Sequence, residues 1–287
     1  MGKIYNAFKK KESEVFDSVM DDGTEPVPEE TEYEFCISDA DTSISEPYEE
    51  IPEKEVMPGN IDPSLVTVHS PHSIESEQFR LLKNNILFPE IGTPPKSIMI
   101  TSPSPDEGKS FVAANLAISI AGSIDEHVLL MDCDLRLPTI HKLFGLPDTK
   151  GLSDHLSTAI SLNDLLLKTF IPKLTILPGG TIPRNPSELL SSGQMRSLIH
   201  EVKLRYRDRY IIIDTPPPYI TSEGNALARQ VDGIIVIIRH GKTRIKDVQD
   251  IINIYGKEKI IGVVHNFAEK RPGYGYGYYK YGYGTVK

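Results

Sequence analysis

The residues best suited to chemistry are Gly108, Lys109 and Ser110, which follow the apolar run at residues 98–100 and a polar loop. A strand, such a loop and a helix hold nucleotide phosphates, because loop N–H groups and the positive helix end face the phosphate oxygens. Lys109 would reach the outer phosphates, and the Ser110 hydroxyl would bind Mg²⁺. The full motif has Gly where this chain has Pro103. Taken alone, the motif therefore leaves open a chance Gly-Lys-Ser in a loop.

Three carboxylates follow two further apolar runs. Asp132 and Asp134 come after residues 128–131, and Asp214 comes after residues 210–213 and precedes Thr-Pro-Pro-Pro. In the first pair, one carboxylate can bind Mg²⁺ while the other accepts a proton or orients an acceptor. Asp214 is placed as in a Walker B motif, where Asp holds the ion or its bound water. Each signal alone is weak, but the three in this order predict nucleotide binding.

The elements that would position these residues alternate along the chain. Strands are expected at residues 97–101, 128–131, 174–177, 210–213, 233–238 and 260–264, and helices at 73–88, 110–121, 185–204 and 243–255. Short, continuously apolar strands separated by helices predict an α/β fold with a doubly wound, mostly parallel sheet of the P-loop NTPase type. Ligands of such sheets bind outside the carboxyl ends of the strands, where each motif above falls.

The N-terminal residues 1–69 are expected to be a largely disordered, acidic region. Between Asp21 and Asn60 lie 14 acidic residues and one lysine, so this stretch has a charge of −13. Because the whole chain has a net charge of −9, the remainder carries +4 and is mildly basic. Such a stretch buries too little apolar surface to offset its ordering entropy. Residues 3–19 are either a frayed end or a short amphipathic helix. The P-loop domain is predicted at residues 70–270.

Composition restricts the compartment and the partners. Cys36 and Cys133 lie far apart without metal-type spacing, which favours a reducing compartment. No apolar run reaches 18 residues and no secretory signal opens the chain, so a cytoplasmic protein is expected, recruited to the inner face of the cell membrane through a partner. Lys270, Arg271 and Lys280 are too few to make an acidic chain a nucleic-acid binder.

The last 17 residues, 271–287, form a tail in which tyrosine largely alternates with glycine. Its tyrosines are Tyr274, Tyr276, Tyr278, Tyr279, Tyr281 and Tyr283. Glycine denies such a segment a fixed fold, so the tyrosines are expected to be flexible and accessible. They are either a low-complexity adhesive tail or a set of phosphate acceptors.

From about Ser70 onward, the chain resembles the bacterial protein-tyrosine kinases (BY-kinases) of capsule and exopolysaccharide synthesis. The resemblance rests on the loop at residues 100–110, the second Walker-like motif at residues 130–136, Asp214-Thr-Pro-Pro and the tyrosine tail. It implies a cytoplasmic kinase whose membrane domain is a separate protein. The implied activity is transfer of the γ-phosphate of ATP to tail tyrosines, in trans within an oligomer.

The resemblance also implies roles for single residues. Catalysis would involve Lys109, Asp132, Asp134 and Asp214, with Mg²⁺ at Ser110, Asp132 and Asp214. ATP would be bound by Pro105, Asp106, Glu107, Gly108, Lys109, Ser110 and Phe111, with Asn266 at the adenine. Subunits would meet through Glu77, Arg80 and Lys83, where Lys83 replaces the Arg of the family motif and loses its bidentate geometry. Glu223 replaces the usual Asp and has no assigned role.

The implied partners are further copies of the chain, with a ring as one form, a transmembrane adaptor or polysaccharide co-polymerase, a cognate tyrosine phosphatase, and no nucleic acid. The alternative is a non-kinase ATPase of the partitioning or division-site type, acting as a positional switch. Such ATPases usually carry Lys where this chain has Ser104, and some end in a basic amphipathic helix instead of a Gly/Tyr tail. Both features favour the kinase.

Overall fold

Parallel strands form the centre of the sheet that carries the predicted motifs. The computed structural model describes residues 3–4, 54–55, 60–158, 160–205, 209–218 and 223–268. All of them belong to one of the two units of the chain, residues 1–6 and 52–287. In chain order, the elements are β1 (Lys3–Ile4), β2 (Lys54–Glu55), α1 (Val66–His69), α2 (Ile74–Leu87), β3 (Ser97–Thr101), α3 (Lys109–Ala121), β4 (His127–Asp132), α4 (Ile140–Leu143), α5 (Leu152–Thr158), η1 (Leu162–Asp164), β5 (Leu167–Lys168), β6 (Leu174–Leu177), α6 (Pro186–Leu190), α7 (Gly193–Arg205), β7 (Arg209–Asp214), α8 (Glu223–Ala228), β8 (Gly233–Arg239), α9 (Ile245–Tyr255), η2 (Lys257–Lys259) and β9 (Ile260–Asn266).

The strand order confirms a mostly parallel sheet. Among the described residues, the order is β1-β9-β8-β3-β7-β4-β6-β5-β2. The strands from β9 to β6 run parallel, whereas β5 is antiparallel to β6 and β1 is antiparallel to β9. The central strand β3, which leads into the P-loop, lies between β7 and β8. This order brings together the carboxyl ends of β3, β7 and β4.

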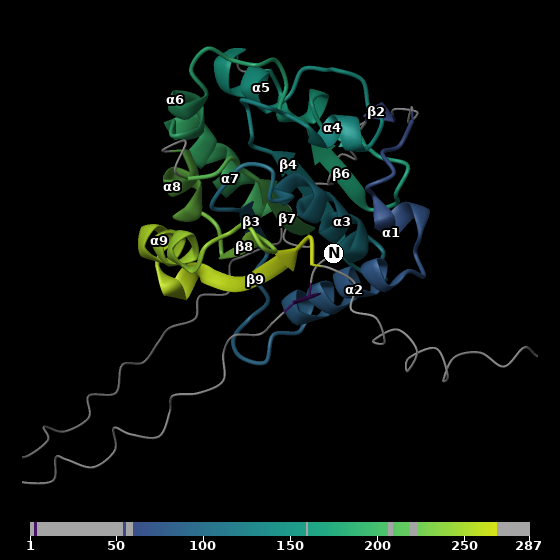
Figure 1. Ribbon diagram of the computed structural model, residues 1–287. Coiled ribbons are helices and arrows are strands. Elements are labelled where there is room, and N and C mark those ends of the chain that lie inside the picture. The colour runs from purple at the N-terminus through teal and green to yellow at the C-terminus, as the bar shows by residue number, and fades with distance from the viewer. Residues whose placement is uncertain are drawn as a thin grey trace, which may run out of the picture. The chain divides into compact units, whose positions relative to one another are not determined.

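Helices cover both faces of the sheet, which confirms the doubly wound fold. Ile98 and Ile100 of β3 pack with α2 and α3, whereas Met99 packs on the opposite face with residues of α7 and α9. Figure 1 shows α2 and α3 on one side of the sheet and α6–α9 on the other. Because both faces are covered, β3, β6 and most of β4 and β7 are buried along their length. This is why these strands are apolar throughout rather than alternating.

Helix α2 packs one face against the core. Ser73 caps its start, with the Ser76 N–H donating to Ser73 Oγ at 3.1 Å. Phe79, Leu82 and Ile86 are buried against the core. The predicted subunit-contact residues Glu77 and Arg80 lie off this face and are joined by an ion pair of 2.5 Å.

Three expectations differ from the structure. The fold begins before Ser70, because Leu65 is fully buried and Thr67 of α1 bonds through its N–H and hydroxyl to Asn115 of α3. Lys3–Ile4 is a strand that pairs with β9 rather than the start of a helix. Residues 5–19, the rest of the expected helix, lie outside the described residues. The single helix expected at 185–204 is wrong. It is broken into α6 and α7, and Ser192 Oγ caps α7 by accepting the Met195 N–H at 3.1 Å.

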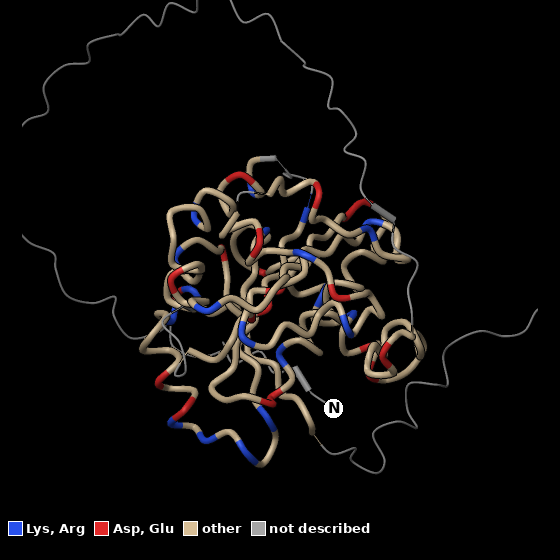
Figure 2. The backbone as a smooth tube through the Cα atoms, turned by 90° about the horizontal axis from the view of Figure 1, so that it is seen from above, with Lys and Arg blue, Asp and Glu red and all other residues tan. Residues whose placement is uncertain are grey.

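Charges of both signs are interspersed over the folded part (Figure 2). The electrostatic field at the predicted motifs therefore has to come from residues placed locally, not from a face of one sign. No helix in the described ranges has the length and apolar character needed to cross a membrane.

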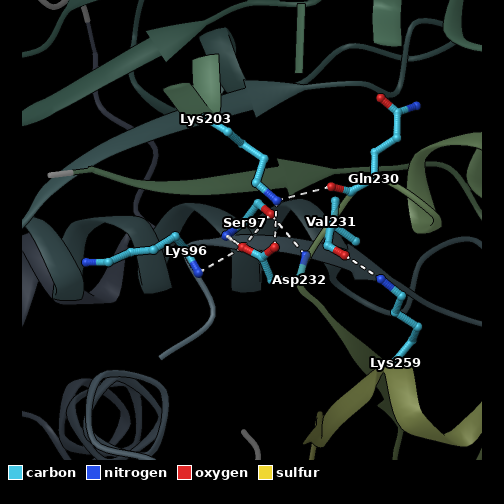
Figure 3. A network of polar contacts seen from close by, with 7 residues as sticks. All are labelled: Lys96, Ser97, Lys203, Gln230, Val231, Asp232 and Lys259. Atoms are coloured by element: carbon cyan, nitrogen blue, oxygen red, sulfur yellow. Dashed lines mark hydrogen bonds and ion pairs between the residues drawn. The ribbon is translucent and has the colours of Figure 1, made fainter. Parts of the chain in front are cut away.

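A polar network fastens the amino ends of β3 and β8 (Figure 3). Asp232 accepts hydrogen bonds from the Ser97 N–H at 2.8 Å, the Ser97 hydroxyl at 2.9 Å and Lys203 Nζ at 2.6 Å. Burial alone would raise the pKa of Asp232, but the bonds from Lys203 and Ser97 outweigh it and hold that pKa below its usual value. The network joins α7 to the sheet at the end away from the motifs.

Candidate active site

The P-loop closes on a glycine that no other residue could replace without strain. Gly108 has φ +91° and forms the N-cap of α3, and an added Cβ would lie 2.1 Å from Asn266 Nδ2. The other positive φ in the loop, +59°, is at Asp106. Pro103 lacks a positive φ, so this loop does not need the glycine that the full motif places there.

The first turn of α3 meets the end of β7. Ser110 Oγ donates to Asp214 Oδ2 at 2.5 Å, and Lys109, in the same turn, is only 7% exposed. Asp214 is fully buried, and its Oδ1 has no hydrogen-bond partner among the described residues. A buried carboxylate oxygen without a partner is costly unless a ligand or ion completes it.

Asp132 lies beside Asp214, because the two residues are register partners on β4 and β7. It is fully buried, and its Oδ2 accepts the N–H groups of Thr139 at 2.9 Å and Ile140 at 3.0 Å. These bonds hold the carboxylate from the start of α4. The sequence therefore predicted two acidic residues that the fold does bring together.

Burial shifts the protonation of both carboxyls. It raises the pKa of Asp214 from 3.8 to about 7, against the opposing effects of the Ser110 hydrogen bond and the Lys109 charge. Burial, and then the neighbouring Asp214 charge, raises the pKa of Asp132 well above its usual range. Two adjacent buried carboxylates of this kind strongly favour a bound cation.

Asp134 and Arg136 lie further toward solvent. Asp134 is half-buried and its Oδ1 accepts the Leu137 N–H at 3.2 Å, while the exposed Arg136 donates from Nη2 to Ser187 Oγ at 3.1 Å. Asp134 is thus the most accessible carboxyl of the three.

The remaining predicted ATP-binding residues differ in where their side chains lie. Pro105 and Asp106 are exposed, whereas Glu107 is 1% exposed and turned into the protein. The Phe111 ring packs edge-to-face on Phe79, with 5.7 Å between ring centroids, so only the Phe111 backbone could contact a ligand at the loop.

Asn266 lies against the P-loop at the end of β9. Its Nδ2 donates to the Glu107 carbonyl at 3.0 Å, and its Oδ1 accepts the Phe267 N–H at 2.9 Å. The adenine contact expected of it remains a prediction. Glu77, Arg80 and Lys83 belong to α2, outside this group, and the six tail tyrosines lie outside the described residues.

Two further residues at the P-loop, Arg239 and Thr243, were not predicted from the sequence. Thr243 donates its hydroxyl to Glu107 Oε1, and Arg239 Nη1 donates to the Asp106 carbonyl at 3.1 Å. Their position at the carboxyl end of β8, where Arg239 is the last residue of the strand and Thr243 follows it, is the signal that would have pointed to them.

The residues fit Mg²⁺ and a nucleotide on three observations. Asp214 Oδ1 is an unpartnered buried oxygen within the described part of the chain, the Lys109 ammonium belongs to the same helical turn as Ser110, and the donors are hard oxygens of hydroxyl and carboxylate type. Such oxygens suit Mg²⁺, which usually takes one or two carboxylates and completes its shell with water and phosphate.

Comparison with known proteins shows the family of the chain. A family model named ParA, described as an NUBPL iron-transfer P-loop NTPase, matches residues 95–273. Over 205 residues the chain is 37% identical to tyrosine-protein kinase YwqD of Bacillus subtilis, covering 71% of this chain and 85% of that protein. The chain belongs to the bacterial tyrosine-kinase family.

Solved structures of this family share the fold. The kinase domain of Escherichia coli tyrosine kinase ETK aligns with a TM-score of 0.65 and 31% identity, over 74% of this chain and 84% of that one. The chimerical protein CapA2B2 aligns with the same TM-score and 33% identity, over 72% of this chain and 91% of that one. Against the full-length tyrosine-protein kinase etk of Escherichia coli K12, the match is 33% identical over 64% of this chain and spans only 25% of the relative. These kinase relatives favour the tyrosine-kinase interpretation over the positional ATPase.

Proposed function

We propose that this chain is an ATP-dependent protein-tyrosine autokinase that transfers the γ-phosphoryl group to tyrosines of its own C-terminal tail. The observation that carries the proposal is the contact between Ser110 and Asp214, with Asp132 beside it, at the P-loop of a member of the tyrosine-kinase family. Bound Mg²⁺·ATP supplies the transferred group and the cation that neutralises its charge.

The chain's own residues do the positioning. Ser110, Asp132 and Asp214 would hold the cation, and the Lys109 ammonium would neutralise charge on the outer phosphates. Asp132 is fixed in place by two backbone N–H groups, so it needs no reorganisation when the cation arrives. Positioning and charge neutralisation supply most of the catalysis in phosphoryl transfer.

Asp134 is proposed to take the acceptor's proton. The tyrosine oxygen forms a bond to the γ-phosphorus while the bond from that phosphorus to ADP breaks, and the phenolic proton passes to a carboxylate. A free tyrosine has a pKa of about 10, so this proton leaves only as the new bond forms. Asp134 is suited to accept it because it is the least buried of the three carboxyls.

The acceptors are proposed to be the six tail tyrosines, presented by a neighbouring copy. The tail lacks acidic residues and carries Arg271, Lys280 and Lys287. Each added phosphate brings about −1.5 to −2 charges, so several would reverse the sign of the tail and drive copies apart. Glu77, Arg80 and Lys83 are the proposed contact between copies.

Further partners are proposed on the same family basis. They are a transmembrane adaptor that recruits this cytoplasmic chain to the inner face of the membrane and activates it, and a phosphatase that resets the tail. The pathway served would be capsule or exopolysaccharide synthesis.

The first test incubates the full chain with Mg²⁺·ATP and blots for phosphotyrosine. We expect a signal from the wild type that Lys109→Met abolishes, whereas Lys173→Met, which removes a partly buried lysine bound to Ile124 O, retains it. An undiminished signal from Lys109→Met would refute the proposal, as would no wild-type signal in the presence of an adaptor's cytosolic segment.

The second test concerns the acceptor. Changing the six tail tyrosines to Phe should remove most of the phosphate uptake seen by intact-protein mass spectrometry while ADP binding persists. Tyr210→Phe, at a core position only 1% exposed, is the matched control and should label normally. Unchanged uptake by the tail variant would exclude the tail as the main acceptor.

A further inference from the structure

Two successive carbonyl groups of the P-loop are held from outside the loop. The Asp106 carbonyl accepts Arg239 Nη1 at 3.1 Å, and the Glu107 carbonyl accepts Asn266 Nδ2 at 3.0 Å. Arg239 ends β8 and Asn266 ends β9, so the donors come from two neighbouring strands. The loop thus takes its shape partly from residues more than 130 positions later in the chain.

Anchoring a carbonyl also orients the N–H group that follows it. In a trans peptide, the C=O of one residue and the N–H of the next point in opposite directions, and no cis peptide occurs in the described ranges. The N–H groups of Glu107 and Gly108 are therefore turned away from Arg239 and Asn266. Within the described part of the chain, neither N–H has an acceptor. Both are available to an anion.

The Glu107 carboxylate fastens the loop from its other side. Its Oε2 accepts the Ser104 N–H at 3.0 Å across the loop, and its Oε1 accepts the Thr243 hydroxyl. Thr243 Oγ1 in turn accepts the Arg239 N–H at 2.8 Å. Thr243 is thus bonded both to the P-loop and to one of the residues that anchor its carbonyls.

The anchoring side chains are themselves restrained. The Arg239 guanidinium lies over the Phe267 ring at 4.3 Å, and the Phe267 N–H donates to Asn266 Oδ1 at 2.9 Å. Asn266 is 4% exposed. A donor held in one orientation gives up little entropy when it fixes its acceptor.

We infer that Arg239, Thr243 and Asn266 are positioning residues that set the P-loop for phosphate before nucleotide binds, with Glu107 as the buried acceptor that joins them to it. Arg239 and Asn266 turn the Glu107 and Gly108 N–H groups toward the phosphates by holding the carbonyls on the other side. Thr243 restrains Arg239 and the Glu107 carboxylate. The inference rests on the proposed binding of ATP and goes beyond it, because it assigns roles to residues outside the Walker motifs.

The test compares Thr243→Val with Thr243→Ser in the full chain. Thr169→Val is the matched control, because the half-buried Thr169 hydroxyl is a hydrogen-bond donor as well but lies away from the P-loop, just after β5. It donates to two backbone carbonyls, at 3.0 and 3.1 Å. ADP affinity is measured by calorimetry, ATP kinetics by phosphotyrosine formation, and stability by thermal unfolding. Loss of the hydroxyl should weaken ADP binding about tenfold, equivalent to about 1.4 kcal/mol. KM for ATP should rise similarly while kcat stays within about twofold, since the phosphates are held equally in ground and transition states.

Retention of affinity by Thr243→Ser and by Thr169→Val, with loss in Thr243→Val alone, would support the inference. Wild-type affinity in Thr243→Val would overturn it while leaving the proposed function intact. An equal loss in Thr243→Val and Thr169→Val would also overturn it, because the effect would then be general destabilisation. A wild-type chain that binds no nucleotide would instead overturn the proposed function and this inference with it.

Discussion

Replacing Asp214 by Asn should stabilise the nucleotide-free protein at the expense of its activity. Burial raises the pKa of Asp214 from 3.8 to about 7, and each pKa unit corresponds to about 1.4 kcal/mol. Keeping this carboxyl ionised in the fold at pH 8 therefore costs about 4 kcal/mol. Part of the stability gained by removing the charge is lost again in the variant, because the new amide has no acceptor at the position of Oδ1, a penalty of about 1–3 kcal/mol.

The pH dependence separates these two effects. Because the folded-state pKa of Asp214 is raised, the folded protein still holds a proton between about pH 4 and pH 7, where the unfolded chain has already released it. Wild-type stability therefore falls as the pH rises through that window. The penalty for burying the amide without an acceptor does not depend on pH. The advantage of Asp214→Asn over the wild type should therefore be about 3 kcal/mol larger at pH 8 than at pH 4.5.

The assay is urea unfolding of both proteins without nucleotide at the two pH values, together with phosphotyrosine formation at pH 8. We expect the variant to lose phosphorylation because it lacks a proposed ligand of the cation. An advantage of equal size at both pH values would refute the argument that Asp214 is buried as a costly charge. So would an advantage that is larger at pH 4.5.

Two further predictions separate stability from nucleotide binding. Asp232→Asn should lower the free energy of unfolding by about 1–2 kcal/mol, because its partly exposed ion pair with Lys203 is lost, and ADP affinity measured by calorimetry should not change. A changed affinity would contradict its position at the far end of the sheet. Gly108→Ala should weaken ADP binding at least tenfold, since its Cβ would displace Asn266, whereas Gly92→Ala, also at a positive φ but with open space around it, should bind normally. Equal binding by both glycine variants would count against the close approach.

The sequence predicted most of the fold where burial dictates residue type. Strands such as β6 and β7 are apolar along their length because both sheet faces are covered, so their positions were correct to within about one residue. The break between α6 and α7 was missed because the apolar spacing continues across it, although Ser192 and Gly193 mark the new start. Short elements such as α4 depend on tertiary contacts and carry too few residues to show a period.

The candidate site divides in a similar way between residues that could be predicted and residues that could not. Asp132 and Asp214 could be predicted together because carboxyl ends of parallel strands meet at one edge. The bond from Thr243 to Glu107 could not, because a hydroxyl and a carboxylate 136 residues apart leave no periodic trace in the sequence.

The position of β3 in the sheet has a consequence during synthesis. Ser97 of this strand is bonded to Asp232, 135 residues later, and the strand is flanked by β7 and β8. A nascent chain that has emerged only as far as residue 205 carries every residue of the P-loop, yet its strand has neither neighbour. Since chains leave the ribosome N-terminus first and contacts distant in sequence form slowly, nucleotide binding must await nearly the whole domain. An incomplete translation product of this length therefore lacks the assembled P-loop site.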